Sequence, residues 1–412
     1  MPGEAVADQP AARQRERRIL LVDCDAFFVQ VARLHDPEGA GRARLLIVGG
    51  SPTDRGVVTS ASYECRAFGV RSAMPTAQAL RLCPDAMVVG VPRGAVMEKS
   101  REVRAVLEHL APVVQAASVD EFYLDLTGTE RLFAAETLEA TARRIRDGVL
   151  ARTCVEVSIG GGTGRVIAKL ATAKAKPAGV YIVAPGQERD FLDQLELADL
   201  PGVGPALADV LRARGLVRVR DAVAVQREWL ERWLGKRRGA WLWRRVHGLD
   251  DSEVEPRERR RSLSAERTFF EDLGRDEDLE RRLMEIAATV ASGLRKEGLC
   301  AQTITVKLRD YDFRTRSRSR TLPEPVESDA AILDVARTLL RELRAQRHVA
   351  ARLLGVGLSG LAEGSGTRQL GLFADPVAGE SERDRTLSRT VDQLRKRFGR
   401  DAVRPGRLLD DE

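Results

Sequence analysis

Two kinds of hydrophobic pattern alternate along the first half of the chain. Short apolar runs typical of buried strands, such as RILLVD at 18–23, are separated by stretches with helical spacing, such as residues 96–110. The segment PVVQAASVDEFYLDLTG at 112–128 predicts two strands joined by a bend, and a helix is expected over 136–150. Strand and helix patterns interleave up to about residue 185, which predicts a mixed α/β unit.

The second half divides into two further patterns. Residues 186–250 predict short helices broken by LPGVGP at 200–205, which indicates a small α domain. The stretch DDSEVEPRERRR at 250–261 is charged, contains proline and has no apolar face, so it is interpreted as a linker. Residues 262–361 predict strand, helix, two strands, helix and strand, an α+β domain. The tail continues with EGSGTRQLGLF and a helix over SRTVDQLRKRF.

Length and composition exclude several classes of protein. At roughly 100 to 200 residues per domain, 412 residues correspond to two to four domains. No apolar run reaches 18 residues, and the polar, basic N-terminus lacks a secretory signal, so we expect a cytoplasmic protein without a membrane partner. Five scattered cysteines without CxxC spacing argue against disulfides or a zinc site. A net charge of +6 permits a polyanionic partner.

Three acids at predicted strand ends are the first candidates for chemistry. Asp23 ends a buried strand, and Asp120 and Glu121 lie at the bend between two others. Neighbouring residues on a strand point to opposite faces, so Asp120 and Glu121 can share a site only at a bend or strand end. Converging carboxylates are the ligands that a pair of divalent ions needs. The alternative is that all three are simply solvated.

Aromatic and basic residues near these acids suggest a nucleotide site. In DCDAFF, Phe27 and Phe28 directly follow an acid-ended strand, although such a pair can equally belong to the core. Tyr63 and Arg66 are three residues apart and share one helical face, where both could reach a phosphate group. Lys169 is a plausible phosphate partner in the helix after SIGGGTGR. That glycine run fits neither the GK[ST] ending nor the GxGxxG spacing of nucleotide loops.

Two further segments suggest contact with a nucleic-acid backbone. In LPGVGP, Gly202 and Gly204 could expose backbone N–H groups to a phosphate, or could simply cap a helix-helix turn. In KLRDYDFRTRSRSR, arginines recur with period two, so a strand would place all of them on one face. They are Arg314, Arg316, Arg318 and Arg320. A stripe of one sign fits a phosphate backbone better than an ordinary solvated face.

Taken together, these residues resemble a Y-family (translesion) DNA polymerase of the bacterial DNA polymerase IV class. DCDAFF, SYECRAFGVRSAMP and SVDEFYLDLT occur in the family's order and at its intervals, and the match covers about residues 18 to 373. The resemblance implies an α+β multidomain, right-hand polymerase of low fidelity. It implies a ferredoxin-like palm, small fingers, a helix-hairpin-helix thumb and an α+β little finger.

The resemblance also implies roles for individual residues. Asp23, Asp120 and Glu121 would bind two Mg²⁺ ions with the Cys24 carbonyl, and Phe28 would be the steric gate that rejects a ribose 2′-OH. Phe27 would lie beside it under the incoming nucleotide. The positions expected to grip the triphosphate are Ser60, Tyr63, Arg66 and Lys169. The QLGLF motif would dock on the replication sliding clamp through Gln369, Leu370, Leu372 and Phe373.

Domain boundaries and partners follow from the same resemblance. The expected domains are a flexible N-terminus 1–15, palm 16–25 and 93–185, fingers 26–92, thumb 186–250, linker 251–261, little finger 262–361 and tail 362–412. The partners would be primer-template DNA, deoxynucleoside triphosphates and the clamp, and a monomer is expected. The segment GGGTGR departs from the family's usual polar turn before the Lys169 helix.

Two other functions remain open from sequence. A catalytically silent, clamp-tethered DNA-binding accessory protein could keep the fold, although Asp23, Asp120 and Glu121 are all present. A cyclase-like enzyme could share the palm and its two-metal chemistry. The QLGLF motif and the arginine stripe would then have no purpose.

Overall fold

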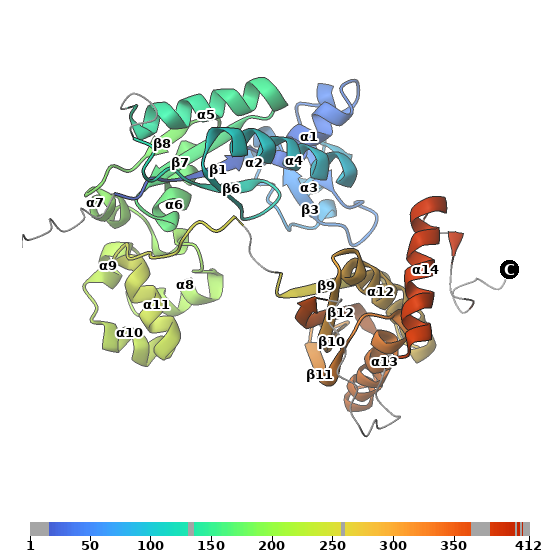
Figure 1. The fold of residues 1–412 in the computed structure, drawn as a ribbon. Coiled ribbons are helices and arrows are strands. Elements are labelled where there is room, and N and C mark those ends of the chain that lie inside the picture. Colours follow the sequence, from blue (N-terminus) through green and yellow to red (C-terminus); the bar gives the residue numbers. More distant parts are fainter. Residues whose placement is uncertain are drawn as a thin grey trace, which may run out of the picture. The chain divides into compact units, whose positions relative to one another are not determined.

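The computed structural model describes residues 16–130, 136–256, 260–363, 380–399, 402–403 and 406. The chain divides into two compact units, Met1–Glu258 and Arg259–Glu412. Each unit is described by itself below. The α+β multidomain architecture expected from the sequence is confirmed (Figure 1).

A five-stranded sheet is the centre of the part of the first unit that the sequence analysis expects to be the palm. Its strand order is β5-β6-β1-β7-β8, and only the β7–β8 pair is parallel. The connection β1-α4-β5-β6-α5-β7 with this order is ferredoxin-like, as expected. The elements are β1 (Ile19–Cys24), α4 (Arg93–Leu110), β5 (Val113–Ala116), β6 (Glu121–Asp125), α5 (Leu138–Thr153), β7 (Val157–Gly162), α6 (Arg165–Ala175) and β8 (Val180–Ile182).

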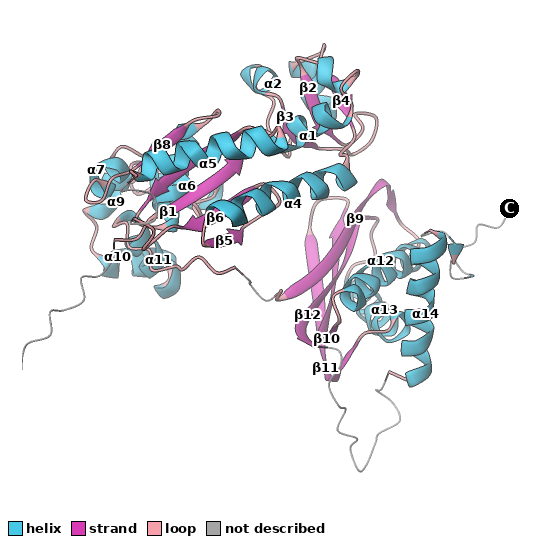
Figure 2. Ribbon diagram, turned by 45° about the horizontal axis from the view of Figure 1, so that its top comes forward, coloured by secondary structure: helices cyan, strands magenta, loops and turns pink. Residues whose placement is uncertain are grey.

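Side chains of β1 alternate between two buried layers because successive residues on a strand point to opposite faces. Leu20 and Val22 join the core that α4 and α5 cover. Ile19 and Leu21 pack on the other face, with Ala168 of α6. A strand that is covered on both faces has a continuous apolar sequence. This is why RILLVD could be recognised as a buried strand (Figure 2).

The fingers contain a small three-stranded sheet with the order β3-β2-β4. Its core is small and includes two cysteines, Cys65 and Cys83. The elements are α1 (Phe27–His35), a 3₁₀ turn (Ala40–Arg42), β2 (Leu46–Gly49), β3 (Val58–Ala61), α2 (Tyr63–Ala67), α3 (Thr76–Leu82) and β4 (Met87–Val89).

The thumb consists of short helices, as the sequence predicts for 186–250. They share one apolar core with the outer side of α6, through residues such as Ile167 and Leu170. The elements are α7 (Glu188–Asp193), a 3₁₀ turn (Leu197–Asp199), α8 (Pro205–Arg212), α9 (Val219–Val223), α10 (Arg227–Leu234) and α11 (Lys236–Val246).

The second unit has the strand and helix order predicted for 262–361. Its antiparallel sheet has the order β11-β10-β12-β9, and α12 and α13 share one core with it (Figure 2). The elements are β9 (Ser262–Leu273), α12 (Asp276–Lys296), β10 (Leu299–Asp310), β11 (Thr315–Val326), α13 (Asp329–Gln346), β12 (Ala351–Glu363) and α14 (Glu382–Phe398).

The C-terminal helix α14 is attached to the second unit by ion pairs. Arg295, whose side chain is buried, lies 2.8 Å from Asp329 and 2.7 Å from Asp392 of α14. The buried carboxylate of Glu380 accepts hydrogen bonds from the backbone N–H groups of Glu327, at 2.9 Å, and Ser328. The helix is therefore an integral part of this unit.

Among the residues that the structure describes, no helix combines the length and the apolar character needed to cross a membrane.

Candidate active site

The structure brings the three predicted acids together at the ends of neighbouring strands. Asp23, near the end of β1, lies directly opposite Glu121, the first residue of β6. Asp120 precedes it in the bend, and its carbonyl accepts a hydrogen bond from the Cys24 N–H at 2.9 Å. The Ser118 hydroxyl holds the bend by accepting hydrogen bonds from the N–H groups of Asp120 and Glu121. Strand pairing therefore fixes the positions of the acids.

Two lysines on or just after α6 balance these acids. The Lys169 amine lies 2.7 Å from both carboxylate oxygens of Glu121, and the Lys176 amine lies 2.7 Å from Asp23 Oδ1. Burial raises the pKa of Asp23 to about 6; Lys176 opposes the shift, and Glu121 and Asp120 add to it. Burial would lower the pKa of Lys169, but the hydrogen bond to Glu121 and the nearby negative charges, above all that of Glu121, together outweigh burial and raise it.

The donor set fits a divalent metal by its chemistry. Carboxylate and carbonyl oxygens are the ligands that Mg²⁺ takes, and three carboxylates at one sheet edge concentrate negative charge that a cation would relieve. Within the described ranges, no three His, Cys, Asp or Glu side chains converge closely enough to hold an ion as they stand. Binding would therefore require carboxylates to exchange their lysine partners for the ion.

Phe27 and Phe28 have different environments at the start of α1. The Phe28 ring is half-buried, whereas Phe27 is only 1% exposed and belongs to the palm core. Their rings meet edge to face with centroids 5.9 Å apart. The prediction that Phe27 contacts the nucleotide is therefore wrong for its side chain, because α1 turns that residue inward. Phe28 stays partly accessible, and its role as a steric gate remains a prediction.

Tyr63 and Arg66 lie on one face of α2, as the sequence predicts. The Arg66 guanidinium lies 4.8 Å from the centre of the Tyr63 ring. The Tyr63 hydroxyl donates a 2.8 Å hydrogen bond to Asp25. Ser60 is also on the fingers, in β3, but it is buried. Of these three candidates, only Tyr63 and Arg66 present accessible side chains to a triphosphate.

Asp25 is a residue of the site that the sequence analysis missed. Its carboxylate is buried and also accepts hydrogen bonds from the Ser158 hydroxyl at 2.7 Å and the Ala178 N–H at 2.8 Å. With Tyr63, this carboxylate joins the fingers to β7 and to the loop that carries Lys176. The available signal was its place in DCDAFF, two residues after Asp23.

The glycine run before Lys169 forms a strand. The sequence analysis treated GGGTGR as a turn, but Gly160, Gly161 and Gly162 lie in β7 and are buried. The reason is helix packing: a Cβ on Gly160 would collide with the backbone of α6 at Thr172 and Ala168. The glycines thus let α6 lie against the sheet, and this helix carries Lys169 to Glu121.

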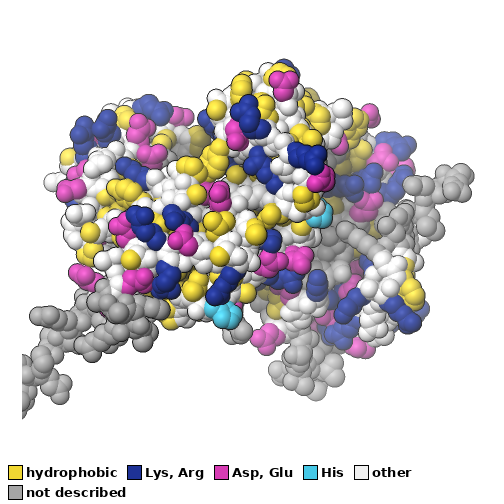
Figure 3. Space-filling view, turned by 90° about the horizontal axis from the view of Figure 1, so that it is seen from above, with side chains coloured by type: hydrophobic (Ala, Val, Ile, Leu, Met, Phe, Trp, Pro, Cys, Tyr) yellow, Lys and Arg dark blue, Asp and Glu magenta, His cyan; other side chains and the backbone are white. Residues whose placement is uncertain are grey.

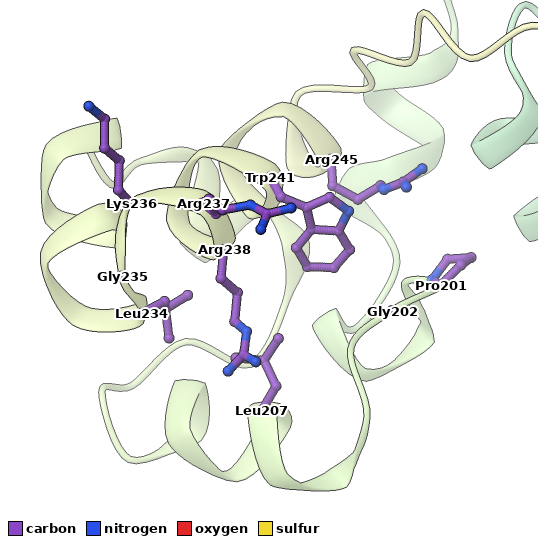
Figure 4. A pocket seen from close by; sticks show the side chains of 10 residues that line it. All are labelled: Pro201, Gly202, Leu207, Leu234, Gly235, Lys236, Arg237, Arg238, Trp241 and Arg245. Atoms are coloured by element: carbon purple, nitrogen blue, oxygen red, sulfur yellow. The ribbon is translucent and has the colours of Figure 1, made fainter. Parts of the chain in front are cut away.

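The LPGVGP hairpin faces a basic hollow in the thumb. Gly202 has a φ of +100°, and a Cβ there would lie 2.6 Å from the Trp241 ring. Gly204 is the N-cap of α8. The hollow, about 880 Å³, is lined by the hairpin, Trp241 and the first turn of α11 (Figure 4). Its basic side chains are Lys236, Arg237, Arg238 and Arg245.

The predicted arginine stripe is not one exposed surface. Arg314 precedes β11, and the other three pair with the core residues Leu308, Val306 and Ile304 of β10, so they lie on the sheet face that carries the helices. The Arg316 side chain is only 11% exposed and lies 2.9 Å from the buried Asp310. Arg320 pairs with Glu342 of α13 at 2.9 Å. The stripe prediction is wrong for Arg316; Arg314 and Arg318 are exposed.

The other face of this sheet is polar. Ser317 and Ser319 of β11 lie opposite Lys307 and Thr305 of β10, and the Thr305 and Ser319 hydroxyls are 2.9 Å apart. The alternation in TRSRSR thus places arginines on one face of the sheet and serines on the other. The sequence analysis interpreted only the arginines. The clamp-motif residues Gln369, Leu370, Leu372 and Phe373 lie outside the described residues.

On the face of the first unit that α4 and α5 form, the described residues make no patch of a single charge. Seen from the side of α4 and α5, basic and acidic side chains are interspersed (Figure 3). Many of them form pairs within one helix, such as Arg104 with Glu108 and Arg143 with Glu139. This face has the mixed signs of an ordinary solvated surface.

Family models match both units of the chain. The model described as impB/mucB/samB family matches residues 22–173, and its C-terminal domain model matches 260–372. The chain is 38% identical to DNA polymerase IV of Caulobacter vibrioides over 94% of this chain and 93% of that protein. It is 37% identical to DNA polymerase IV of Desulfatibacillum aliphaticivorans, over 96% and 98% respectively.

Solved structures that resemble this chain also come from DNA polymerases. The "Y-family DNA polymerase chimera Dbh-Dpo4(243-245)-Dbh" matches with a TM-score of 0.75 and 26% identity, covering 83% of this chain and 98% of that one. The "Crystal Structure of DinB from Sulfolobus solfataricus" matches with a TM-score of 0.56, 26% identity and the same coverage. A Y-family polymerase implies metal-dependent catalysis and synthesis past lesions. The chain therefore belongs to the Y family of DNA polymerases, in the DNA polymerase IV group, and is a DNA-directed DNA polymerase.

Proposed function

We propose that the chain extends a primer 3′-OH on template DNA with deoxynucleoside triphosphates, using two Mg²⁺ ions held by Asp23, Asp120, Glu121 and the Cys24 carbonyl. The supporting observation is the pairing of β1 with β6, which sets Asp23 opposite Glu121 and next to Asp120. When bound, the ions would supply the positive charge that activates the primer hydroxyl and neutralises the phosphates.

Other side chains would bind and select the nucleotide. Arg66 on α2 and Lys169 on α6 would bind its phosphates as cations, and the rigid α2 would position Tyr63 beside them. Phe28 would occupy the space that a ribose 2′-OH needs, so that deoxynucleotides are selected by steric exclusion. Its half-buried ring at the start of α1, shortly after β1, supports this role.

DNA would be held mainly through its backbone. Gly202 and Gly204 in the thumb, with the basic hollow beside them, offer N–H groups and guanidiniums to phosphates. In the second unit we propose that Arg314 and Arg318, which are exposed on or next to the edge strand β11, bind phosphates of the duplex. A solved relative is described as an "Insertion ternary complex of Dbh DNA polymerase". We further propose monomeric action in the bacterial cytoplasm with a sliding clamp as partner.

The test is primer extension by an acid variant. Asp120→Ala should reduce extension at least a thousandfold, while duplex affinity stays within twofold of wild type, because affinity comes from phosphate contacts elsewhere. The matched control is Asp147→Ala, which removes an exposed acid from α5 of the same unit. EDTA should stop the wild type, and added Mg²⁺ should restore it.

Two outcomes would overturn this assignment. If Asp120→Ala extends primers within tenfold of wild type, the acids do not carry the chemistry. If the wild-type chain binds primed DNA but extends nothing with Mg²⁺, the chain is a silent, clamp-tethered accessory protein.

A further inference from the structure

The hairpin between β10 and β11 carries two exposed aromatic rings at its tip. Tyr311 is 53% exposed and Phe313 is 62% exposed. They belong to the DYDF part of the arginine-rich segment, which the proposed function leaves unexplained. Large aromatic side chains at an exposed turn cost solubility, and Tyr and Phe side chains of this kind are typical of binding surfaces.

A buried ion-pair network holds the tip in one conformation. Asp310 is fully buried and pairs with Arg316 at 2.9 Å and Arg347 at 2.6 Å. Arg347 also pairs with Asp312 at 2.9 Å, and the Phe313 N–H donates to the Asp310 carbonyl at 3.0 Å. The tip therefore needs little further ordering when it binds a ligand.

Phe313 has a strained backbone in this turn. Its φ of +66° lies in the left-handed region, which is unfavourable for a residue other than glycine. Glycine would relieve this strain but would remove the ring. The structure thus keeps an aromatic side chain exposed where local folding alone would favour glycine.

Arginines lie on or next to the strands that carry this tip. The Arg352 guanidinium lies 4.6 Å from the centre of the Phe313 ring, and the neighbouring Arg314 is exposed. Arg309 is fixed by a 2.9 Å hydrogen bond to the Thr315 hydroxyl. Because Asp310 and Asp312 are already paired with Arg316 and Arg347, these three arginines leave the tip positively charged.

We propose that the Tyr311–Phe313 tip is a stacking platform for single-stranded DNA. Exposed rings offer π faces to unstacked bases, and adjacent guanidiniums offer charge to the phosphates, the combination that binds single strands without reading sequence. Paired bases in a duplex hide their faces, so the platform selects single-stranded DNA. The inference rests on the proposed function, in which the unpaired template is the natural occupant. The positive charge favours DNA over an uncharged apolar protein partner.

The experiment measures binding to a labelled single strand of about 12 nucleotides, by anisotropy with the full chain. Tyr311→Ser combined with Phe313→Ser should weaken this binding about tenfold or more, because a stacked base contributes about 1 to 3 kcal/mol. Affinity for a blunt duplex of equal length should stay within twofold. The matched control is Phe398→Ser, which removes an equally exposed ring from α14 of the same unit.

A second variant separates stacking from simple hydrophobic contact. Phe313→Leu keeps apolar volume but lacks a π face, so it should also lose affinity for the single strand. Phe313→Trp should retain that affinity. Equal single-strand affinity in wild type and double variant overturns the proposal, as does full affinity in Phe313→Leu. An equal loss for duplex and single strand also overturns it. Wild-type primer extension is scored separately, so failure of the platform is distinguishable from failure of the polymerase assignment.

Discussion

Phe27 and Phe28 show how adjacent, chemically identical residues acquire different roles. Both follow β1, which carries Asp23 and ends at Cys24, and α1 begins at Phe27. The helix then turns Phe27 into the palm core and leaves Phe28 at its edge. One ring therefore contributes to stability, and the other is available to a nucleotide.

We expect Phe28→Ala to raise ribonucleotide incorporation by a factor of ten or more while changing deoxynucleotide incorporation far less. The reason is that the variant removes a clash and no attraction. Single-nucleotide insertion kinetics with paired ribo- and deoxynucleotides measure this ratio. Unchanged sugar discrimination would contradict the steric gate.

Phe27→Ala provides the contrast at the neighbouring position. Because Phe27 is 1% exposed in the palm core, its loss should lower the free energy of unfolding by about 3 to 5 kcal/mol. Sugar discrimination should not change in the fraction that remains folded. Chemical denaturation measures the first effect, and a stability loss below about 1 kcal/mol would show that the site is less tightly packed than described.

The sequence indicates the acids of the site better than the side chains that pair with them. Asp23, Asp120 and Glu121 could be predicted because strand ends are visible as apolar runs that stop at an acid. Lys176 could not be predicted, and Asp25 was marked only by its place in DCDAFF, because Lys176 pairs with Asp23 and Asp25 binds Ser158 across more than 100 residues of chain. Only the folded sheet brings Ser158 to Asp25 and the end of α6 to Asp23.

At the level of elements, β11 shows what a period of two can and cannot establish. The alternation in TRSRSR correctly predicts a strand. It cannot tell which face carries helices, because that depends on pairing with β10 and on the position of α13. The arginines of β11 lie on the helix side. One of them, Arg316, therefore stabilises the fold by pairing with the buried Asp310.

The arginines of this segment should therefore separate into two classes. Arg316→Ala should lower the free energy of unfolding of the second unit by about 3 kcal/mol, because Asp310 would keep its buried charge with one partner fewer. Far-UV circular dichroism during denaturation measures this loss.

Arg314→Ala combined with Arg318→Ala should leave stability within about 0.5 kcal/mol, because both side chains are exposed. Instead, DNA affinity should fall for all sequences, and the slope of log K against log salt should flatten by about 1.8. Titrations at several salt concentrations measure this. A loss restricted to particular sequences would indicate base reading.

Across the whole molecule, the attachment of α14 should depend on pH through Glu380. Burial would raise the pKa of Glu380, but hydrogen bonds from Ser328 and Arg385 outweigh burial and hold the pKa below its usual value. A carboxyl with a lowered pKa in the folded state stabilises the fold at neutral pH, and this contribution is lost as pH falls below the usual glutamate range.

Glu380→Gln should therefore loosen α14 more at pH 7 than at pH 3.5. Hydrogen exchange of α14 peptides, corrected for the intrinsic rate at each pH, measures the difference. An equal effect of the variant at both values would mean that shape, and not charge, holds the helix.

The QLGLF motif at 369–373 is expected to connect the enzyme to the sliding clamp. Replacing Leu372 and Phe373 with Ala should abolish clamp-stimulated synthesis and leave unstimulated synthesis and melting temperature unchanged. A short motif can bind with few anchors, and tethering raises the local concentration of the enzyme at the primer end. A parallel fall in basal synthesis would show that these residues are structural.

The central position of β1 has a consequence for how the molecule fluctuates. This strand is hydrogen-bonded to β6 on one side and β7 on the other, and both of its faces are covered. Water can reach one of its amides only when the sheet separates on the side to which that amide donates and the covering core loosens, whereas the fingers are held by a much smaller core. The backbone amides of Leu21 and Val22 should thus be among the last in the first unit to exchange. The fingers can then open locally around an incoming nucleotide. The acids meanwhile keep their spacing, because they lie at the end of this well-protected strand pair.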